Sequence, residues 1–312
     1  MKMALWRRKA KQANIVIKDH VLRYVEAKPG HPPEARRWGE RALPPGIIRD
    51  GKIADRETLA MILDECVDEW KLDGRRVCFV VPDPFVMIRH LPLPVHLPDE
   101  DIRGYLFMEL GESIPLPFAD PVFDYIVAER TEEALNVLLF AAPEEAVAEY
   151  AALLEDAGLR PVAADVSPLC AYRPFFVAGQ AAADDHILLV QFDESAVNLS
   201  VFHRHLPQFM RHVPLEAPGE PTAAIVDPFI DVYKEIERMM SFYSFSIQQG
   251  KQQITRLFLT GDHPRLDDVF AVMSERLDVP PERLSRSLDP LPDRYHLAWG
   301  LALKEGRADY DR

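Results

Sequence analysis

The same order of predicted elements occurs twice along the chain, and this duplication restricts the fold more than any other feature. Each copy starts with short hairpin strands, continues with an amphipathic helix and ends with a continuous apolar strand. The first copy is expected at 14–17, 21–27, 55–72 and 76–81. The second copy is expected at 187–192, 196–203, 208–213, 221–249 and 256–260. We therefore expect an α/β fold built from two related halves.

A further unit separates the two copies. It is predicted to contain a strand, a helix, two strands and a helix, at 86–93, 98–110, 122–129, 134–140 and 143–157. The preceding stretch 29–45 is rich in proline, glycine and charge and is expected to be irregular. We thus expect a first subdomain at 1–85, an inserted α+β subdomain at 86–160 and a second half at 161–312. The long helix 221–249 would belong to the upper subdomain of that second half.

The composition is that of a folded protein with an acidic surface. Of 312 residues, 48% are hydrophobic, and 50 acidic against 36 basic side chains give a formal charge of −14. Such a field repels phosphate backbones, so we expect no nucleic-acid partner. The chain has only 14 glycines but 27 prolines. Phosphate-binding loops need glycine for close backbone approach, so this ratio weighs against a nucleotide-dependent enzyme.

The sequence carries no membrane-span pattern and no signal-peptide pattern, which predicts a cytoplasmic protein. The three cysteines, Cys66, Cys78 and Cys170, lack a CxxC spacing and are expected to be buried thiols. The start, 1–11, mixes Leu5 and Trp6 with several basic residues. It could touch anionic lipid or be a solvated leader, and both interpretations are kept.

Several short segments, in a fixed order, carry a family resemblance. They are LPPGIIRDGKI at 43–53, parts of 91–110, IPLPF at 114–118, DPVFDY at 120–125, DV at 165–166 and YHLAWGLALK at 295–304. Together they resemble the family of the pilus assembly protein PilM and its relative FtsA, over residues 15–304. The resemblance implies an actin-like (ribonuclease H-like) duplicated fold with an inserted α+β subdomain. It also implies a cytoplasmic component of a type IV pilus or competence pseudopilus machine, and some members bind ATP.

The nucleotide motifs of such folds are degenerate here. Actin-like proteins hold phosphates and metal with two Asp-x-Gly hairpins, because glycine frees backbone N–H groups and the aspartate orients the metal. The first hairpin keeps Asp19 but has no glycine. In the second, Gln191 replaces the aspartate and Asp193 replaces the glycine. The adenine-side Gly-Gly pair reads Gly261-Asp262. We expect no bound cofactor and no catalytic residue at this degenerate site, although binding of ATP with Mg²⁺ stays open.

Other constellations of reactive residues predict no chemistry. His203 and His205 alternate on one strand and could hold a metal, but a third ligand at a suitable spacing is missing. Ser167 and Ser195 have no evident His–Asp partners, and no G-x-S-x-G motif is present. The aromatic run 242–245 is expected to pack in the core.

The resemblance also implies a partner site. In the family, the cytoplasmic tail of a PilN-type inner-membrane protein lies in a groove between the first and inserted subdomains. On this chain 80–93 and 105–123 would line that groove, where an extended peptide adds edge hydrogen bonds and fills apolar pockets. The candidate partner-binding residues are Arg89, Tyr105, Glu109, Pro115 and Phe118.

These observations predict a non-catalytic adaptor, held at the inner face of the cell membrane through its partner. A pilus motor ATPase is a second expected partner. Two alternatives are an active actin-like ATPase and an FtsA-like, filament-forming membrane tether. The sequence leaves open which machine is served and whether the protein forms a homodimer.

Overall fold

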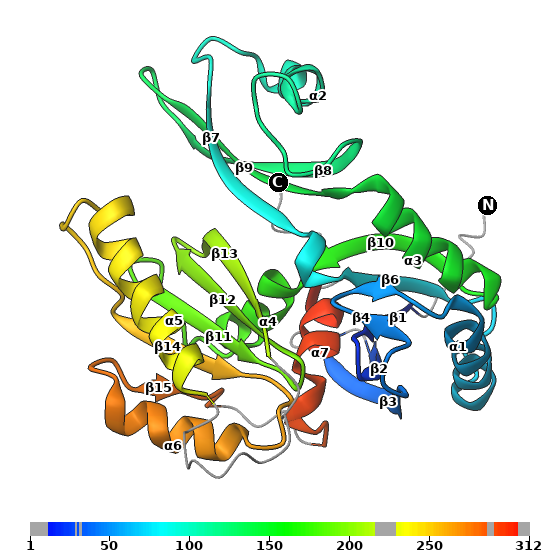
Figure 1. Cartoon of the computed structure of the whole chain (residues 1–312). Coiled ribbons are helices and arrows are strands. Elements are labelled where there is room, and N and C mark those ends of the chain that lie inside the picture. The colour runs from blue at the N-terminus through cyan, green and yellow to red at the C-terminus, as the bar shows by residue number, and fades with distance from the viewer. Residues whose placement is uncertain (1–11, 29, 31–32, 216–228, 286–289, 305–312) are drawn as a thin grey trace, which may run out of the picture. The chain divides into compact units, whose positions relative to one another are not determined.

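The chain forms two compact units in the computed structural model, which describes residues 12–28, 30, 33–215, 229–285 and 290–304 (Figure 1). Unit 1 comprises Met1–Pro82, Glu149–Val177 and Ser287–Arg312. Unit 2 comprises Asp83–Ala148 and Ala178–Arg286. The finer division at 85 and 160 stays a prediction.

Unit 1 is built on a five-stranded sheet with the order β10-β6-β1-β2-β3. Its strands are β1 (Gln12–Ile17), β2 (Val21–Lys28), β3 (Glu34–Ala42), β6 (Arg76–Val81) and β10 (Arg160–Val166). The first three form an antiparallel meander, and β6 runs parallel to both β1 and β10. Nearly every residue of β1 and β6 is buried, as their continuous apolar sequences require.

Unit 2 contains a second five-stranded sheet, ordered β13-β12-β11-β14-β15. Its strands are β11 (His186–Phe192), β12 (Ala196–His203), β13 (Leu206–Pro214), β14 (Arg256–Thr260) and β15 (Pro281–Glu282). Again the first three form an antiparallel meander, and β14 runs parallel to β11 and β15. The two sheets therefore have the same strand order and directions, which confirms the predicted duplication.

The expectation of an irregular stretch at 29–45 was wrong, because β3 lies within it. This strand is polar and half-exposed, so it lacks the apolar alternation that marks a strand in sequence. It is held to β2 partly by opposite charges placed directly across the pair. Arg23 faces Glu40 with 2.5 Å between Nε and Oε2, and Arg37 faces Glu26 at 3.8 Å. Cross-strand ion pairs thus take part of the role that apolar pairs have elsewhere.

The helices of unit 1 pack against its sheet. The small hairpin of β4 (Ile48–Arg49) and β5 (Lys52–Ile53) leads into α1 (Arg56–Trp70), and α3 (Glu144–Asp156), α4 (Ser167–Val177) and α7 (His296–Ala302) follow. A 3₁₀ turn at Asp293–Tyr295 precedes α7. Asp55 caps α1 by accepting from the N–H of Thr58 at 3.0 Å. Each helix of the described chain is too short or too polar to cross a bilayer.

Helices α4 and α7 cross without any side chain between them at one point. A Cβ on Gly300 would lie 1.7 Å from the carbonyl oxygen of Cys170. That backbone-to-backbone approach lets Arg173 donate a hydrogen bond to the Gly300 carbonyl at 3.1 Å. Arg173 also forms a buried ion pair with Asp165 at 2.8 Å. The crossing thus joins α7, α4 and the end of β10.

Two helices cover one face of the second sheet (Figure 1). These are α5 (Ile230–Phe242), which continues as a π-helix over Tyr243–Ile247, and α6 (Leu266–Arg276). The predicted helix 221–249 is confirmed from Ile230 onward, and 221–228 lies outside the described residues. Tyr243 is fully buried as predicted, whereas Phe242 and Phe245 are 49% and 74% exposed. The core expectation was wrong for these two rings, because they lie off the buried stripe of the helix.

Unit 2 also carries the predicted inserted sheet, with the order β7-β9-β8 and antiparallel pairing. The strands are β7 (Met87–Leu93), β8 (Pro121–Arg130) and β9 (Leu135–Pro143). Short 3₁₀ turns at Asp83–Phe85 and Asp99–Asp101 precede β7 and α2 (Ile102–Glu109), respectively. Buried Ile102 and Leu106 of α2 pack on Val137 and Leu139 of β9. One face of this sheet, called here the α2 face, is thereby covered by α2.

The crossing of α4 and α7 can be tested with a glycine pair. Gly300→Ala should lower the free energy of unfolding by about 3 kcal/mol, because the new methyl group must separate two backbones. Gly104→Ala is the matched control, since Gly104 is an exposed helical residue with no atom within 4 Å of an added Cβ. It should raise stability by about 1 kcal/mol. Urea unfolding measures both, and equal effects would contradict the tight crossing.

Candidate functional site

The five residues of the degenerate nucleotide motifs fall in both units. Asp19 lies in the β1–β2 turn of unit 1, and Gln191, Asp193, Gly261 and Asp262 lie in unit 2. Each group is therefore described within its own unit.

Asp19 supports a backbone turn. Its carboxylate accepts the N–H groups of Asp50 and Gly51 at 2.6 and 3.1 Å. Both residues have positive φ, 49° and 74°, as expected for the tight turn between β4 and β5. The Tyr150 hydroxyl donates to the Gly51 carbonyl at 2.9 Å, and burial raises the pKa of that phenol, with Asp19 adding to the effect. Charge-assisted bonds of this kind give the carboxylate a structural role inside unit 1.

Gln191 and Asp193 form a buried pair at the β11–β12 hairpin. They are 2% and 1% exposed, and the Gln191 amide donates a hydrogen bond to the Asp193 carboxylate. The Asp193 N–H closes the hairpin by donating to the Ala196 carbonyl at 2.9 Å. A buried aspartate at the position of the family's glycine brings negative charge to a phosphate loop. Such a group repels another anion strongly where water is scarce.

Gly261 allows two strand ends to meet. Its φ is +143°, and an added Cβ would lie 1.9 Å from the Phe192 carbonyl oxygen. The next residue, Asp262, accepts the Glu194 N–H at 3.1 Å, and the His263 N–H donates to the Phe192 carbonyl at 3.2 Å. The remaining glycine therefore holds the ends of β14 and β11 together through backbone contact.

An aromatic cluster lies beside this junction. The rings of Phe192, Phe229 and His263 meet edge to face, with centroids 5.0 to 5.1 Å apart. The Arg265 guanidinium lies over Phe229 at 5.1 Å. Burial lowers the pKa of His263, against the opposing effect of Glu194. A neutral, ring-packed environment of this kind stabilises the junction through aromatic contact.

The alternating histidines do not assemble a metal site in the part of the chain that the structure describes, where no group of three or more His, Cys, Asp or Glu is placed to hold an ion. The His203 ring stacks on His186 at 4.1 Å between centroids. The His186 Nδ1 lies 2.5 Å from the Tyr243 hydroxyl. Both rings therefore serve internal packing.

All five candidate partner residues lie on the inserted sheet of unit 2 or its connections. Arg89 comes from β7, Tyr105 and Glu109 from α2, and Pro115 and Phe118 from the segment after α2. Arg89 Nη1 donates to the Pro115 carbonyl at 3.1 Å, so it ties that segment to β7. Tyr105 and Phe118 are half-buried against the core of the α2 face. Glu109 is engaged locally, because it accepts the Ser113 hydroxyl.

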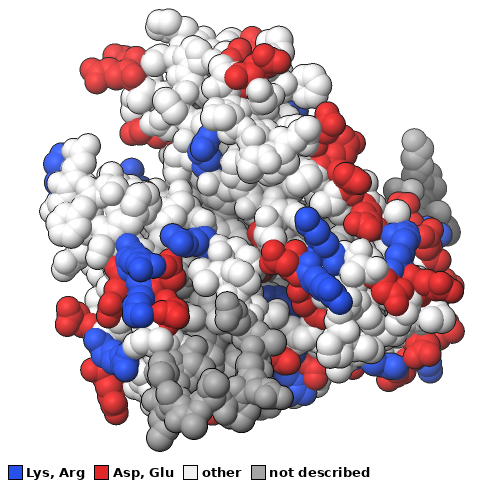
Figure 2. Space-filling view, viewed as in Figure 1, with Lys and Arg blue, Asp and Glu red and all other residues white. Residues whose placement is uncertain are grey.

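Residues not predicted as partner contacts add exposed apolar surface. Phe107 and Met108 on α2 are 75% and 66% exposed, and Val122 and Ile126 on β8 are 36% and 41% exposed. Among the described residues β8 pairs only with β9, so it is an edge strand. The surface of this part is mostly uncharged in Figure 2. The signal for Phe107 and Met108 was present in sequence, since both fall off the stripe that buries Ile102 and Leu106.

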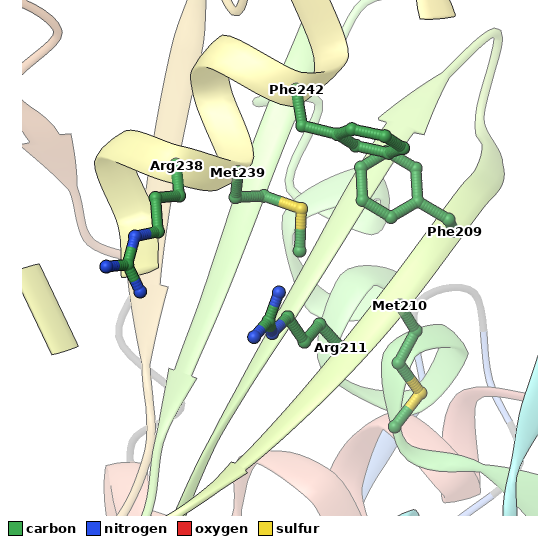
Figure 3. A pocket seen from close by; sticks show the side chains of 6 residues that line it. All are labelled: Phe209, Met210, Arg211, Arg238, Met239 and Phe242. Carbon is green, nitrogen blue, oxygen red and sulfur yellow. The ribbon is translucent and has the colours of Figure 1, made fainter. Parts of the chain in front are cut away.

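A hollow of about 490 Å³ lies between α5 and β13 (Figure 3). Its lining consists of Phe209, Met210, Arg211, Arg238, Met239 and Phe242. Phe209 and Phe242 meet edge to face at 5.4 Å. Arg211 and Arg238 both pair with Glu235, so their positive charge is partly compensated within the chain.

Comparison with known proteins gives a consistent assignment of the fold. A family model described as type IV pilus assembly protein PilM matches residues 33–215. No curated protein sequence matches the chain. A chain of a solved PilM-PilN type IV pilus biogenesis complex is 21% identical, with a TM-score of 0.77 over 96% of this chain and 99% of that one.

Two further solved structures are more distant. The cytoplasmic domain of EpsL, an inner-membrane component of the type II secretion system of Vibrio cholerae, is 11% identical, with a TM-score of 0.52 and 95% of each chain covered. The ethanolamine utilization protein EutJ of Carboxydothermus hydrogenoformans is 12% identical, with a TM-score of 0.51 over 93% of this chain and 88% of that one. These likenesses confirm the predicted actin-like α/β fold.

The structural role of Asp19 can be measured by comparing two aspartates of unit 1. Asp19→Ala should lower the free energy of unfolding by about 2 kcal/mol, because two backbone N–H groups lose a charged acceptor. Asp64→Ala removes an exposed carboxylate of α1 and should change it by less than about 0.5 kcal/mol. Urea unfolding of both variants decides the matter. A harmless Asp19 substitution would mean that the carboxylate is free for another task.

Proposed function

The chain belongs to the type IV pilus assembly protein PilM family, and on this premise we propose that it is a non-catalytic adaptor for the cytoplasmic tail of a PilN-type membrane protein. The protein would be cytoplasmic and held at the inner face of the membrane by that partner. Support for the partner comes from the PilM-PilN complex, which has a chain of the same fold over nearly the full length.

The observation that carries the proposal is the grouping of candidate contacts on the α2 face of the inserted sheet. Arg89 lies directly opposite Leu139, which packs on this face, so Arg89 belongs to the same side. Its hydrogen bond to Pro115 fixes the segment that also contains half-buried Phe118. Tyr105 adds a partly exposed ring. Aromatic and arginine side chains in such a setting are typical of the few residues that dominate a binding energy.

An extended tail suits this surface better than a folded domain does. Half-buried rings can accept apolar side chains of a peptide, and exposed Phe107 and Met108 extend the apolar area. The unpaired edge of β8 offers backbone groups to a further strand, and strand addition is a common mode of peptide recognition. A contact with the pilus motor ATPase, a role in competence and a homodimer stay predictions.

Binding to the tail can be measured by calorimetry with a synthetic peptide from the PilN-type protein of the same organism. Arg89→Ala and Tyr105→Ala should each weaken binding by about tenfold, which corresponds to about 1.4 kcal/mol. Arg130→Ala is the matched control, because Arg130 is on β8 and is paired with Asp99. It should leave the affinity unchanged. If all three variants bind like the original chain, the α2 face is not the peptide site.

We also propose that this activity needs no nucleotide. Support comes from the engagement of Asp19 with a turn and from the buried carboxylate of Asp193, neither of which leaves room for ordinary phosphate binding. The alternative of an active ATPase needs both carboxylates to act differently when nucleotide is present.

A thermal-shift titration separates these alternatives. Millimolar Mg-ATP should leave the melting temperature unchanged, whereas the tail peptide should raise it. A ligand at a hundred times its Kd stabilises a protein by about 2.7 kcal/mol, which is easily detected. A saturable shift with Mg-ATP, lost in Asp193→Ala, would instead favour the ATPase.

A further inference from the structure

One end of the unit 1 sheet gathers positive charge. Strands β1, β6 and β10 are parallel, so their first residues lie at the same end of the sheet. Those residues are Gln12, Arg76 and Arg160, with Arg76 paired between the other two in the strand register. Arg75 adjoins them, because its carbonyl accepts the Arg160 N–H at 2.8 Å. Three arginines thus meet at adjacent positions, here called the arginine end.

The arginine end has no counter-charge of its own in the described chain. Arg75, Arg76 and Arg160 form no ion pair there, although most other arginines of unit 1 do. Arg76 and Arg160 are exposed and lie side by side on neighbouring strands. Like charges in that position destabilise a sheet. In a chain with 50 acidic side chains, such an arrangement suggests that an external anion compensates it.

The basic leader is attached at the same end. Residues 1–11 contain five basic side chains and no acidic one, together with Leu5 and Trp6. They are joined to Gln12, so the Cα of Lys11 is about 3.8 Å from the Cα of the residue that pairs with Arg76. The leader and the arginine end therefore form one basic region on a protein whose formal charge is −14.

We propose that this region binds the anionic surface of a lipid bilayer. A bilayer presents dispersed negative charge in a plane and an interface that accepts tryptophan and leucine, which matches the composition of the leader. The long, flexible arginine side chains can reach such a surface while the sheet stays outside it. Nucleic acid fits less well, because its dense phosphates would meet the acidic remainder of the chain. This contact is independent of the tail site, which lies in unit 2.

Co-sedimentation with lipid vesicles tests the proposal. The original chain should bind vesicles of equimolar phosphatidylcholine and phosphatidylglycerol, but not phosphatidylcholine alone. Each basic residue at an anionic surface contributes about fivefold to binding, so Arg75→Gln, Arg76→Gln and Arg160→Gln together should weaken it on the order of a hundredfold. Deletion of residues 1–11 should also weaken it strongly.

A second triple variant provides the matched control. Lys234→Gln, Arg238→Gln and Arg265→Gln remove the same charge from exposed, ion-paired positions of unit 2 and should leave vesicle binding unchanged. The arginine-end variant should melt no lower than the original chain, because it loses a repulsion. Salt at about 1 M, where the screening length is only about 3 Å, should abolish the binding of the original chain.

Several outcomes would overturn the proposal. They are equal binding to neutral vesicles, binding that survives high salt, an equal loss in both triple variants, and full binding by the arginine-end variant. Binding to duplex DNA instead of vesicles would also overturn it. Affinity for the tail peptide, measured in the same variants, should stay intact, so failure here and failure of the adaptor role can be told apart.

Discussion

The contact between Gly300 and the backbone of Cys170 determines how unit 1 is assembled. Because no side chain intervenes, α7 can lie directly on α4 and also against β1, β2 and β6. Arg173 completes the arrangement by reaching the Gly300 carbonyl and the Asp165 carboxylate. Burial opposes the charge of Arg173, but its negative neighbours keep the pKa of the guanidinium raised. Loss of either charge would leave the other buried and uncompensated, which is the costly way to break such a pair.

The sequence allowed the duplicated core to be predicted, because its central strands are continuous apolar runs. β11 and β12 are buried along almost their full length, and such strands leave a clear pattern. β3 left none, since its role at the sheet edge is met by charged pairs with β2. Phe242 and Phe245 show the reverse case, because aromatic residues on a helix suggest a core whether or not a neighbour covers them.

At the candidate sites, residue types could be predicted but their contacts could not. The departure of Gln191, Asp193 and Asp262 from the family motifs was evident from the order of residues alone. The use of Asp19 to hold the turn at Asp50 could not be foreseen, because 31 residues separate the two in sequence. Hydrogen bonds across such distances depend on the packing of whole elements, which a local pattern does not encode. Likewise, the link from Arg89 to Pro115 depends on how α2 packs on its sheet.

The burial of every cysteine makes this protein well suited to site-specific chemistry. Cys66, Cys78 and Cys170 are the only thiols of the chain, and all three are shielded from solvent. Burial raises the pKa of Cys66 to about 11, and that of Cys170 is raised as well, so neither offers much thiolate at neutral pH. A single cysteine introduced on the surface would therefore react selectively without removal of the native ones. Fluorophores or cross-linkers could then report distances between the two units in solution, within an otherwise unaltered chain.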